Sequence, residues 1–125
     1  MTAAPLPTGR FGRRHRLRAK RDLKRVLRKG RRARGRHLTI ATIDGGTPVS
    51  RLGLAVSKGA GNSPQRARIK RLLREAFRAC RSNWPALDVV AMCRQPWPGA
   101  TLHDVVAELN SLVTRSRSKR ARGRR

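Results

Sequence analysis

Basic side chains between residues 64 and 82 are spaced so that they could bind the phosphates of a nucleic acid. This segment holds seven basic residues and one acid, Glu75. At about 100° per residue, as in an α-helix, apolar residues share one side of the segment and the cations fan around the remainder. A merely solvated face would mix positive and negative charges. The cations that we expect to contact phosphate are Arg66, Arg68, Lys70, Arg71, Arg74 and Arg78.

The turn that precedes this segment is a candidate anion site. Ser63 followed by Pro64 is typical of a helix start, so the turn lies at the positive end of the helix dipole. Its glycines offer backbone N–H groups to an anion, although they also fit as simple turn residues. The residues assigned to this site are Lys58, Gly61 and Asn62.

The sequence shows no catalytic centre built from protein side chains. A protein nuclease would need paired carboxylates for metal ions, or a histidine acting as acid and base. The six acids are scattered, and Asp22, Glu75 and Asp104 each have a local structural explanation at a helix end or along a helix. We therefore expect no catalytic residue and no metal site. The three histidines fall in three different elements, at His15, His37 and His103.

The net charge of +26 restricts the partner. Self-repulsion of this size disfavours a compact state unless a polyanion neutralises it, so nucleic acid is expected rather than an anionic membrane surface. No apolar run is long enough to span a bilayer, and no secretory signal is visible. We expect a cytoplasmic protein with no membrane partner, in which Cys80 and Cys93 are small apolar core residues.

Charge and apolar content divide the 125 residues into a core and two tails. Residues 1–12, rich in proline and glycine, are predicted to be a flexible arm. Residues 115–125 carry seven basic residues and nothing to bury, which predicts a disordered basic tail. Between them, residues 13–114 are expected to form a single RNA-binding α/β domain.

Apolar periodicity predicts elements in the order α, β, β, α, β, α. Such an order is typical of an α+β, two-layer sandwich with helices on one face of a sheet. Gly53 and Ala55 alternate with larger residues, leaving room for a close approach on their side of the strand. The predicted elements are helix 21–29, strand 37–43, strand 51–57, helix 64–82, strand 88–94 and helix 101–114.

Four segments follow one another in an order found in a known family. They are His15 to Arg31, Val56 to Asn62, the basic helix opening with Arg66-Ala67-Arg68, and Asp88 to Pro96. In this order they resemble the bacterial ribonuclease P protein component, over roughly residues 14–115. A basic amphipathic helix alone would not be specific.

The resemblance implies the protein subunit of ribonuclease P, which promotes removal of the 5′ leader of precursor tRNA. It implies a left-handed strand–helix–strand crossover at 51–94. It also implies that catalysis belongs to the RNA subunit with its Mg²⁺, and that the protein alone binds no cofactor. The expected partners are the catalytic RNA, bound through the basic helix, and precursor tRNA, whose leader binds in a cleft on the sheet.

Two departures from the family pattern concern RNA contacts. The middle Asn of the Arg-Asn-Arg motif is Ala67, so an amide hydrogen bond is lost. Positions that are typically aromatic in the family are occupied by leucines, and stacking on an aromatic ring contributes about 1–3 kcal/mol per base. We therefore expect weaker leader stacking. The candidate cleft residues are Arg16, Leu17, Leu23, Leu27 and Leu38.

Two other functions remain open from the residues. A ribosomal-protein-like or RNA-chaperone module fits the charge and size equally well, but not the ordered motifs. An autonomous protein nuclease is disfavoured by the scattered carboxylates.

Overall fold

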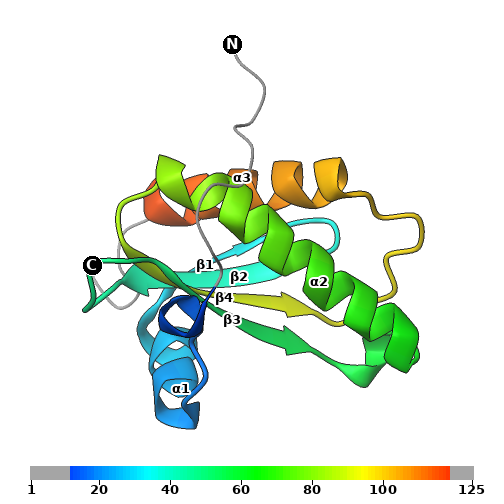
Figure 1. The fold of residues 1–125 in the computed structure, drawn as a ribbon, viewed down its shortest axis with the longest axis horizontal. Helices are drawn as coiled ribbons and strands as arrows, with labels where there is room; N and C mark the ends of the chain where they lie inside the picture. The colour runs from blue at the N-terminus through cyan, green and yellow to red at the C-terminus, as the bar shows by residue number, and fades with distance from the viewer. Residues whose placement is uncertain (1–11, 119–125) are drawn as a thin grey trace.

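The computed structural model describes residues 12–118, which form a four-stranded mixed sheet with three helices (Figure 1). The strand order is β1-β2-β4-β3, with β3 and β4 parallel and the other pairs antiparallel. The predicted α+β class is confirmed, while the left-handed crossover through α2 stays a prediction. The elements are η1 (Arg13–His15), α1 (Lys20–Lys29), β1 (Arg31–Arg34), β2 (Thr39–Asp44), β3 (Arg51–Val56), η2 (Lys58–Ala60), α2 (Ser63–Cys80), η3 (Arg81–Asn83), β4 (Leu87–Cys93) and α3 (Leu102–Ser118).

Strand β1 is absent from the sequence prediction. Its sequence, Arg-Arg-Ala-Arg, lacks the alternating apolar pattern by which a strand is recognised. Only Ala33 is buried, where it pairs with Ile40 of β2. Because β1 lies at the edge of the sheet, pairing with one neighbour is enough to form it.

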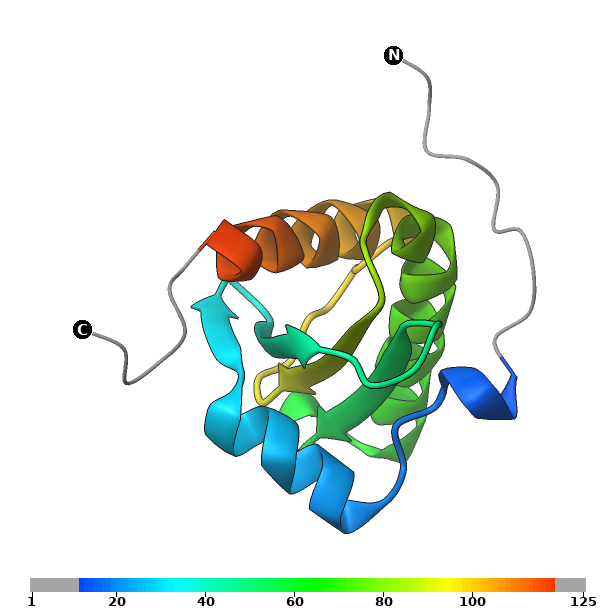
Figure 2. The same cartoon turned by 90° about the vertical axis from the view of Figure 1, so that its left-hand side faces the viewer.

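Helices cover both faces of the sheet, not one face as predicted (Figure 2). Strand β4 is buried along its whole length, so it needs cover on both sides. Every second residue of β4 packs in the core beneath α2 and α3: Leu87, Val89, Ala91 and Cys93. Val90 and Met92 face the opposite way, in a smaller cluster that includes Val26 of α1.

A glycine lets the N-terminal segment approach β3 closely. A Cβ atom on Gly53 would collide with the side chain of Leu23 and lie 3.1 Å from the carbonyl oxygen of Leu17. Leu17 is held there by its N–H, which donates to the carbonyl of Leu52 at 2.9 Å. The close approach expected at Gly53 is therefore confirmed, and the approaching group belongs to the chain itself.

A buried carboxylate ties α1 to the sheet. The Asp88 side chain is 0% exposed and accepts a hydrogen bond from Arg25 of α1 at 2.7 Å. Arg51 of β3 donates to both of its oxygens, from Nε at 2.9 Å and from Nη2 at 2.8 Å. Charge-assisted, bidentate bonds of this kind are among the stronger polar contacts in proteins. They fix α1 over one end of the sheet.

Helix α3 extends past its predicted end at residue 114, so residues 115–118 are helical and are not part of a tail. Ser116 explains the extension, because its hydroxyl is buried 2.8 Å from that of Thr42 in β2. The remaining predicted arm, residues 1–11, and tail, residues 119–125, lie outside the described residues. Within residues 12–118, no helix has the length and apolar character needed to cross a membrane.

The Asp88→Asn substitution should lower the free energy of unfolding by about 3–5 kcal/mol, because it leaves two arginines without their buried carboxylate. Denaturant unfolding measures this loss. Asp44→Asn is the matched control, since Asp44 is 85% exposed and lies 3.5 Å from Arg31. Asp44→Asn should lower the free energy of unfolding by less than about 1 kcal/mol. Equal losses in the two variants would contradict a tie through Asp88.

Candidate nucleic-acid interface

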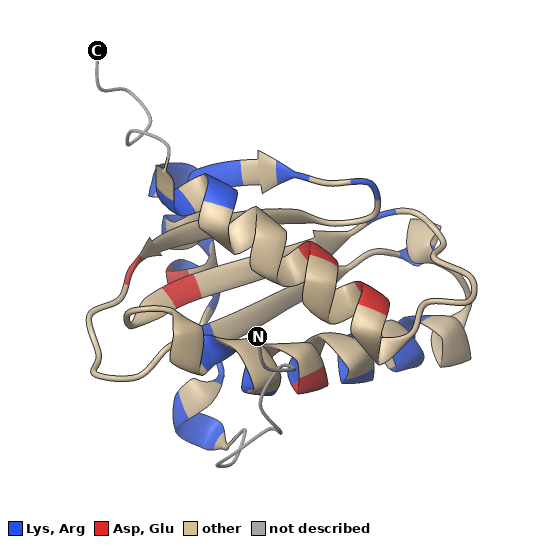
Figure 3. Ribbon diagram, turned by 90° about the horizontal axis from the view of Figure 1, so that it is seen from above, with Lys and Arg blue, Asp and Glu red and all other residues tan. Residues whose placement is uncertain are grey.

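Helix α2 presents its cations because its other side is fixed in the core. Ile69, Leu73 and Phe77 are buried against the sheet. The basic residues, which recur along α2 in Figure 3, are therefore left on the outer side of the helix. The helix begins with a capping box in which Gln65 N–H donates to Asn62 Oδ1 at 2.9 Å and Asn62 N–H donates to Gln65 Oε1 at 2.7 Å. Asn62, rather than Ser63, is the N-cap.

The backbone N–H groups of the turn before α2 already donate hydrogen bonds within the turn. Ala60 N–H donates to Ser57 at 3.0 Å, and Gly61 N–H donates to Lys58 at 3.1 Å. Asn62 N–H is committed to the capping box. Gly61 has a φ of 135°, which favours glycine, so this residue serves the turn. Of the predicted anion site, the exposed Lys58 side chain is the group that could contact an anion.

Of the six predicted cations of α2, three have a hydrogen-bond or ion-pair partner among the described residues and three do not. Arg66 Nε donates to the carbonyl of Gly61 at 3.1 Å, and Arg68 donates to the carbonyl of Ala100, so both also brace neighbouring loops. Arg78 lies 3.3 Å from Glu75. The others donate no hydrogen bond within residues 12–118, which leaves their charges available to phosphate. These are Lys70, Arg71 and Arg74.

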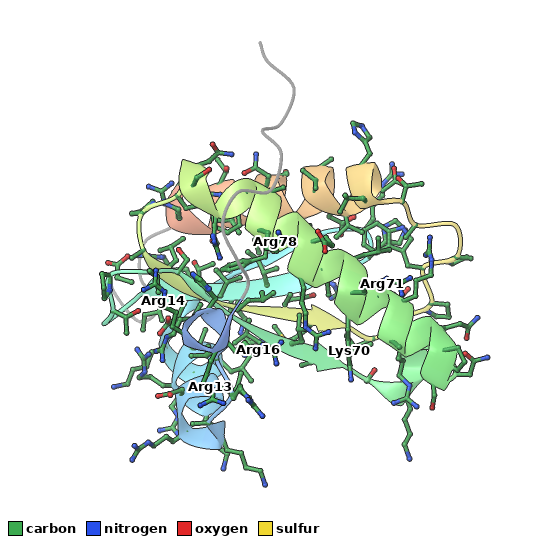
Figure 4. All side chains as sticks on the ribbon, viewed as in Figure 1. Arg13, Arg14, Arg16, Lys70, Arg71 and Arg78 are labelled. Carbon is green, nitrogen blue, oxygen red and sulfur yellow. The ribbon has the colours of Figure 1, made fainter. Side chains whose placement is uncertain are left out.

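A hollow of about 370 Å³ joins the basic helix to the N-terminal segment. Lys70 and Arg74 of α2 line one side, and Arg16 and Arg18 line the other. Figure 4 shows Arg16 and Lys70 on these neighbouring elements. The floor is apolar and no carboxylate lines the hollow, which suits a nucleotide with its base on the floor and its phosphate between the cations. Its apolar lining residues are Leu17, Leu23, Leu52, Gly53 and Leu54.

The structure separates the predicted cleft residues. Arg16, Leu17 and Leu23 line the hollow, although Leu17 is only 3% exposed. Leu27 is half-buried in the cluster between α1 and the sheet. Leu38 is 1% exposed in the core beneath α2 and α3, and it lies at a separate hollow beside β1, not at the one between η1 and α2. Resemblance gave its position in the chain but not the face of the sheet on which it lies.

Cations also gather where η1 meets the end of α2. His15 is buried there, and its Nδ1 accepts the N–H of Gly12 at 3.1 Å. Burial, and then the charges of Arg81 and Arg14, lower the pKa of His15. Burial and the charges of Arg78 and Arg14 likewise lower the pKa of Arg81. The sequence analysis counted Arg81 among the basic residues of the helix, but only the fold brings it near Arg14.

Every acid of the chain is engaged within the protein. Asp88 binds two arginines, and Glu108 accepts the N–H groups of His37 and Leu38, each at 2.8 Å. Asp104 and Thr101 form the expected cap at the start of α3. The remaining acids lie within 4 Å of arginines: Asp22, Asp44 and Glu75. Within residues 12–118, no three metal-binding side chains come together.

Comparison with known proteins gives one consistent family. Residues 11–117 match the family model described as Ribonuclease P. The chain is 32% identical to the ribonuclease P protein component of an Exiguobacterium strain, over 88% of this chain and 96% of that one. It is 38% identical to the component of Syntrophobacter fumaroxidans, over 82% of this chain and 87% of that one.

Solved structures agree with this match. The Staphylococcus aureus RNase P protein mutant with defective mRNA degradation activity superposes with a TM-score of 0.75 at 28% identity, covering 83% of this chain and 89% of that one. The RNase P protein from Thermotoga maritima gives a TM-score of 0.71 at 26% identity, covering 80% of this chain and 96% of that one.

The free energy of unfolding should decrease as the pH falls below about 6.5, the ordinary pKa of histidine. The folded protein holds His15 neutral to a lower pH than the unfolded chain does, so acidification favours unfolding until the folded pKa is passed. Denaturant unfolding at about pH 7.5 and about pH 5.5 measures the change. The decrease should shrink in His15→Gln and persist in His103→Gln, whose histidine is exposed. An unchanged decrease in His15→Gln would contradict this assignment.

Proposed function

Because the chain belongs to the bacterial ribonuclease P protein family and is the protein subunit of that enzyme, we propose that it holds the 5′ leader of precursor tRNA in the hollow between η1 and α2. The observation that carries this proposal is the convergence of Arg16, Lys70 and Arg74 around an apolar floor. An unpaired leader offers both bases and phosphates to such a site. Mature tRNA has no leader, so it cannot occupy the hollow in this way.

The floor of the hollow supports aliphatic rather than aromatic contact with bases. Leu23 is half-buried and packs close to Gly53, so its exposed edge meets the ligand. A leucine lacks the π face on which a base stacks, whose contribution is about 1–3 kcal/mol per base. The arginines and lysine around the hollow therefore supply most of the attraction, and leader binding should be strongly salt-dependent.

The outer side of α2 is proposed to bind the RNA subunit. Arg71 is exposed on this side, and Arg78 lies about two turns further along the helix (Figure 4). A convex helix bearing guanidinium groups fits the phosphates of a folded RNA. Ala67 is exposed within the motif, where its methyl group forms no hydrogen bond. The contact at this position is therefore weaker than one made by an asparagine.

The cleavage chemistry is proposed to belong to the RNA subunit and the Mg²⁺ that it holds. Support comes from the acids of this chain, because each one already binds an arginine, a backbone N–H or a helix start. Moving Asp88 or Glu108 to a metal would break several hydrogen bonds that hold α1 and the turn after β1. The protein then contributes binding and orientation of the leader, which lower the barrier without a protein acid or base.

Purified protein free of RNA should not cleave precursor tRNA at the mature 5′ end, whatever the Mg²⁺ concentration. Cleavage should appear when the catalytic RNA is added. The protein should increase the rate of cleavage by that RNA most at low Mg²⁺. Gel assays of protein alone, RNA alone and both together measure this. Cleavage by protein alone at the mature end would overturn the assignment of chemistry to the RNA.

Lys70→Gln/Arg74→Gln should weaken binding of precursor tRNA by the reconstituted enzyme while leaving mature tRNA affinity unchanged. Each lost single-strand phosphate contact should lower the salt slope of binding by about 0.7. Lys24→Gln/Arg28→Gln is the matched control, with the same residue types and spacing on exposed positions of α1. A loss shared equally by precursor and mature tRNA would show that Lys70 and Arg74 do not hold the leader.

A further inference from the structure

A hollow of about 310 Å³ lies between the first turns of α2 and the loop that joins β4 to α3. Figure 1 shows this loop, in yellow, at the end of the molecule where α2 begins. The hollow shares no lining residue with the one between η1 and α2. Helix α2 contributes Gln65, Arg68 and Ile69, and the loop contributes residues 96–99. No Asp or Glu is among the lining residues.

The loop is held in place by contacts with three other elements. Arg68 of α2 donates to the carbonyl of Ala100 at the end of the loop. The Trp97 ring stacks on His37, with centroids 4.1 Å apart and planes 5° from parallel. A Cβ atom on Gly59 of η2 would lie 2.5 Å from the carbonyl oxygen of the residue after β4, so η2 lies directly against the start of the loop. The hollow is therefore preorganised, and a ligand need not order its walls on binding.

The hollow contains hydrogen-bond donors that the protein does not use. Trp97 is 8% exposed, yet its indole N–H has no acceptor within residues 12–118. An indole N–H usually has a partner when it is buried. Arg68 uses one of its five N–H groups on Ala100. Gln65 uses its Oε1 in the capping box, and its side-chain NH2 group donates no hydrogen bond to a described residue. These donors fit a ligand that carries acceptors.

Charge favours an anionic ligand on this side of Trp97. Lys58 and Arg66 lie within two residues of the lining and add to the charge of Arg68. The hollow on the other side of Trp97, beside α3, contains Asp104 as well as arginines, so its charges are mixed. A nucleotide matches both properties of the first hollow, because its base carries oxygen and ring-nitrogen acceptors and its phosphates are anionic.

We propose that this hollow receives the base of one unpaired nucleotide of the catalytic RNA, with the flanking phosphates on Arg68 and its neighbouring cations. This inference rests on the proposed binding of that RNA by the outer side of α2, and it adds the RNA feature that is recognised. A base inside a continuous RNA duplex is paired and stacked, so it cannot enter the hollow. A bulged base can enter, where Ile69 and the exposed Pro96 and Pro98 offer apolar contact.

The first test uses the full chain and two small probes in ¹H–¹⁵N NMR spectra. Each of the four nucleoside 5′-monophosphates carries a base and a phosphate, whereas ribose 5-phosphate carries only the phosphate. At least one nucleotide should shift the indole N–H signal of Trp97 saturably, and ribose 5-phosphate should not. The indole of Trp84, which donates to Asn110 at 3.1 Å, is the internal control and should not shift. No shift at Trp97, or an equal shift with ribose 5-phosphate, would overturn the proposal.

The second test uses the RNA itself and the Trp84→Phe variant, in which Trp97 is the one remaining tryptophan. Binding of the catalytic RNA should lower the fluorescence of Trp97, whereas binding of a fully paired RNA duplex should leave it unchanged. An equal change with both RNAs, or no change with either, would show that no base enters the hollow.

Arg68→Gln should weaken binding of the catalytic RNA about tenfold more than binding of the duplex, because charge-assisted hydrogen bonds at the hollow are lost. Arg71→Gln is the matched control, since Arg71 is exposed on α2 and does not line the hollow. It should weaken binding of both RNAs alike. If Arg71→Gln weakens RNA binding but Trp97 responds to neither nucleotides nor RNA, this inference fails while the proposed role of α2 stands.

Discussion

Repulsion among 32 basic side chains is the constraint to which the rest of this structure responds. Six acids cannot neutralise that charge, and the two most buried of them, Asp88 and Glu108, each hold several partners. Asp88 joins Arg25 and Arg51, and Glu108 joins two backbone N–H groups and a histidine. One tie docks α1 and the other fixes the turn after β1. None of the six acids lines the hollow between η1 and α2, so its positive charge is not offset there.

The sequence was sufficient for those features that depend on local pattern. The apolar stripe of α2 and the strand after it have strong periodicity, and the cap formed by Thr101 and Asp104 is local in the chain. The cations of α2 could be predicted because burying Phe77 forces them outward. Family resemblance added the function, which the comparisons confirm.

What could not be predicted depends on pairing between distant segments. Strand β1 carries no pattern of its own and exists because β2 supplies its hydrogen bonds. Leu38 precedes β2, and its burial in the core depends on the packing of α2 and α3 over the sheet, which no local pattern reports. The joining of Arg16 to Lys70 in one hollow requires the N-terminal segment to pair with β3, and no local signal reports that contact.

The arginines of β1 also affect how the protein behaves before it meets RNA. An edge strand exposes backbone groups that can pair with the sheet of another molecule, a common route to aggregation. Here such pairing would bring the guanidinium groups of two copies face to face. Electrostatic repulsion between these guanidinium groups should therefore oppose such pairing, so the charge of β1 protects its own edge.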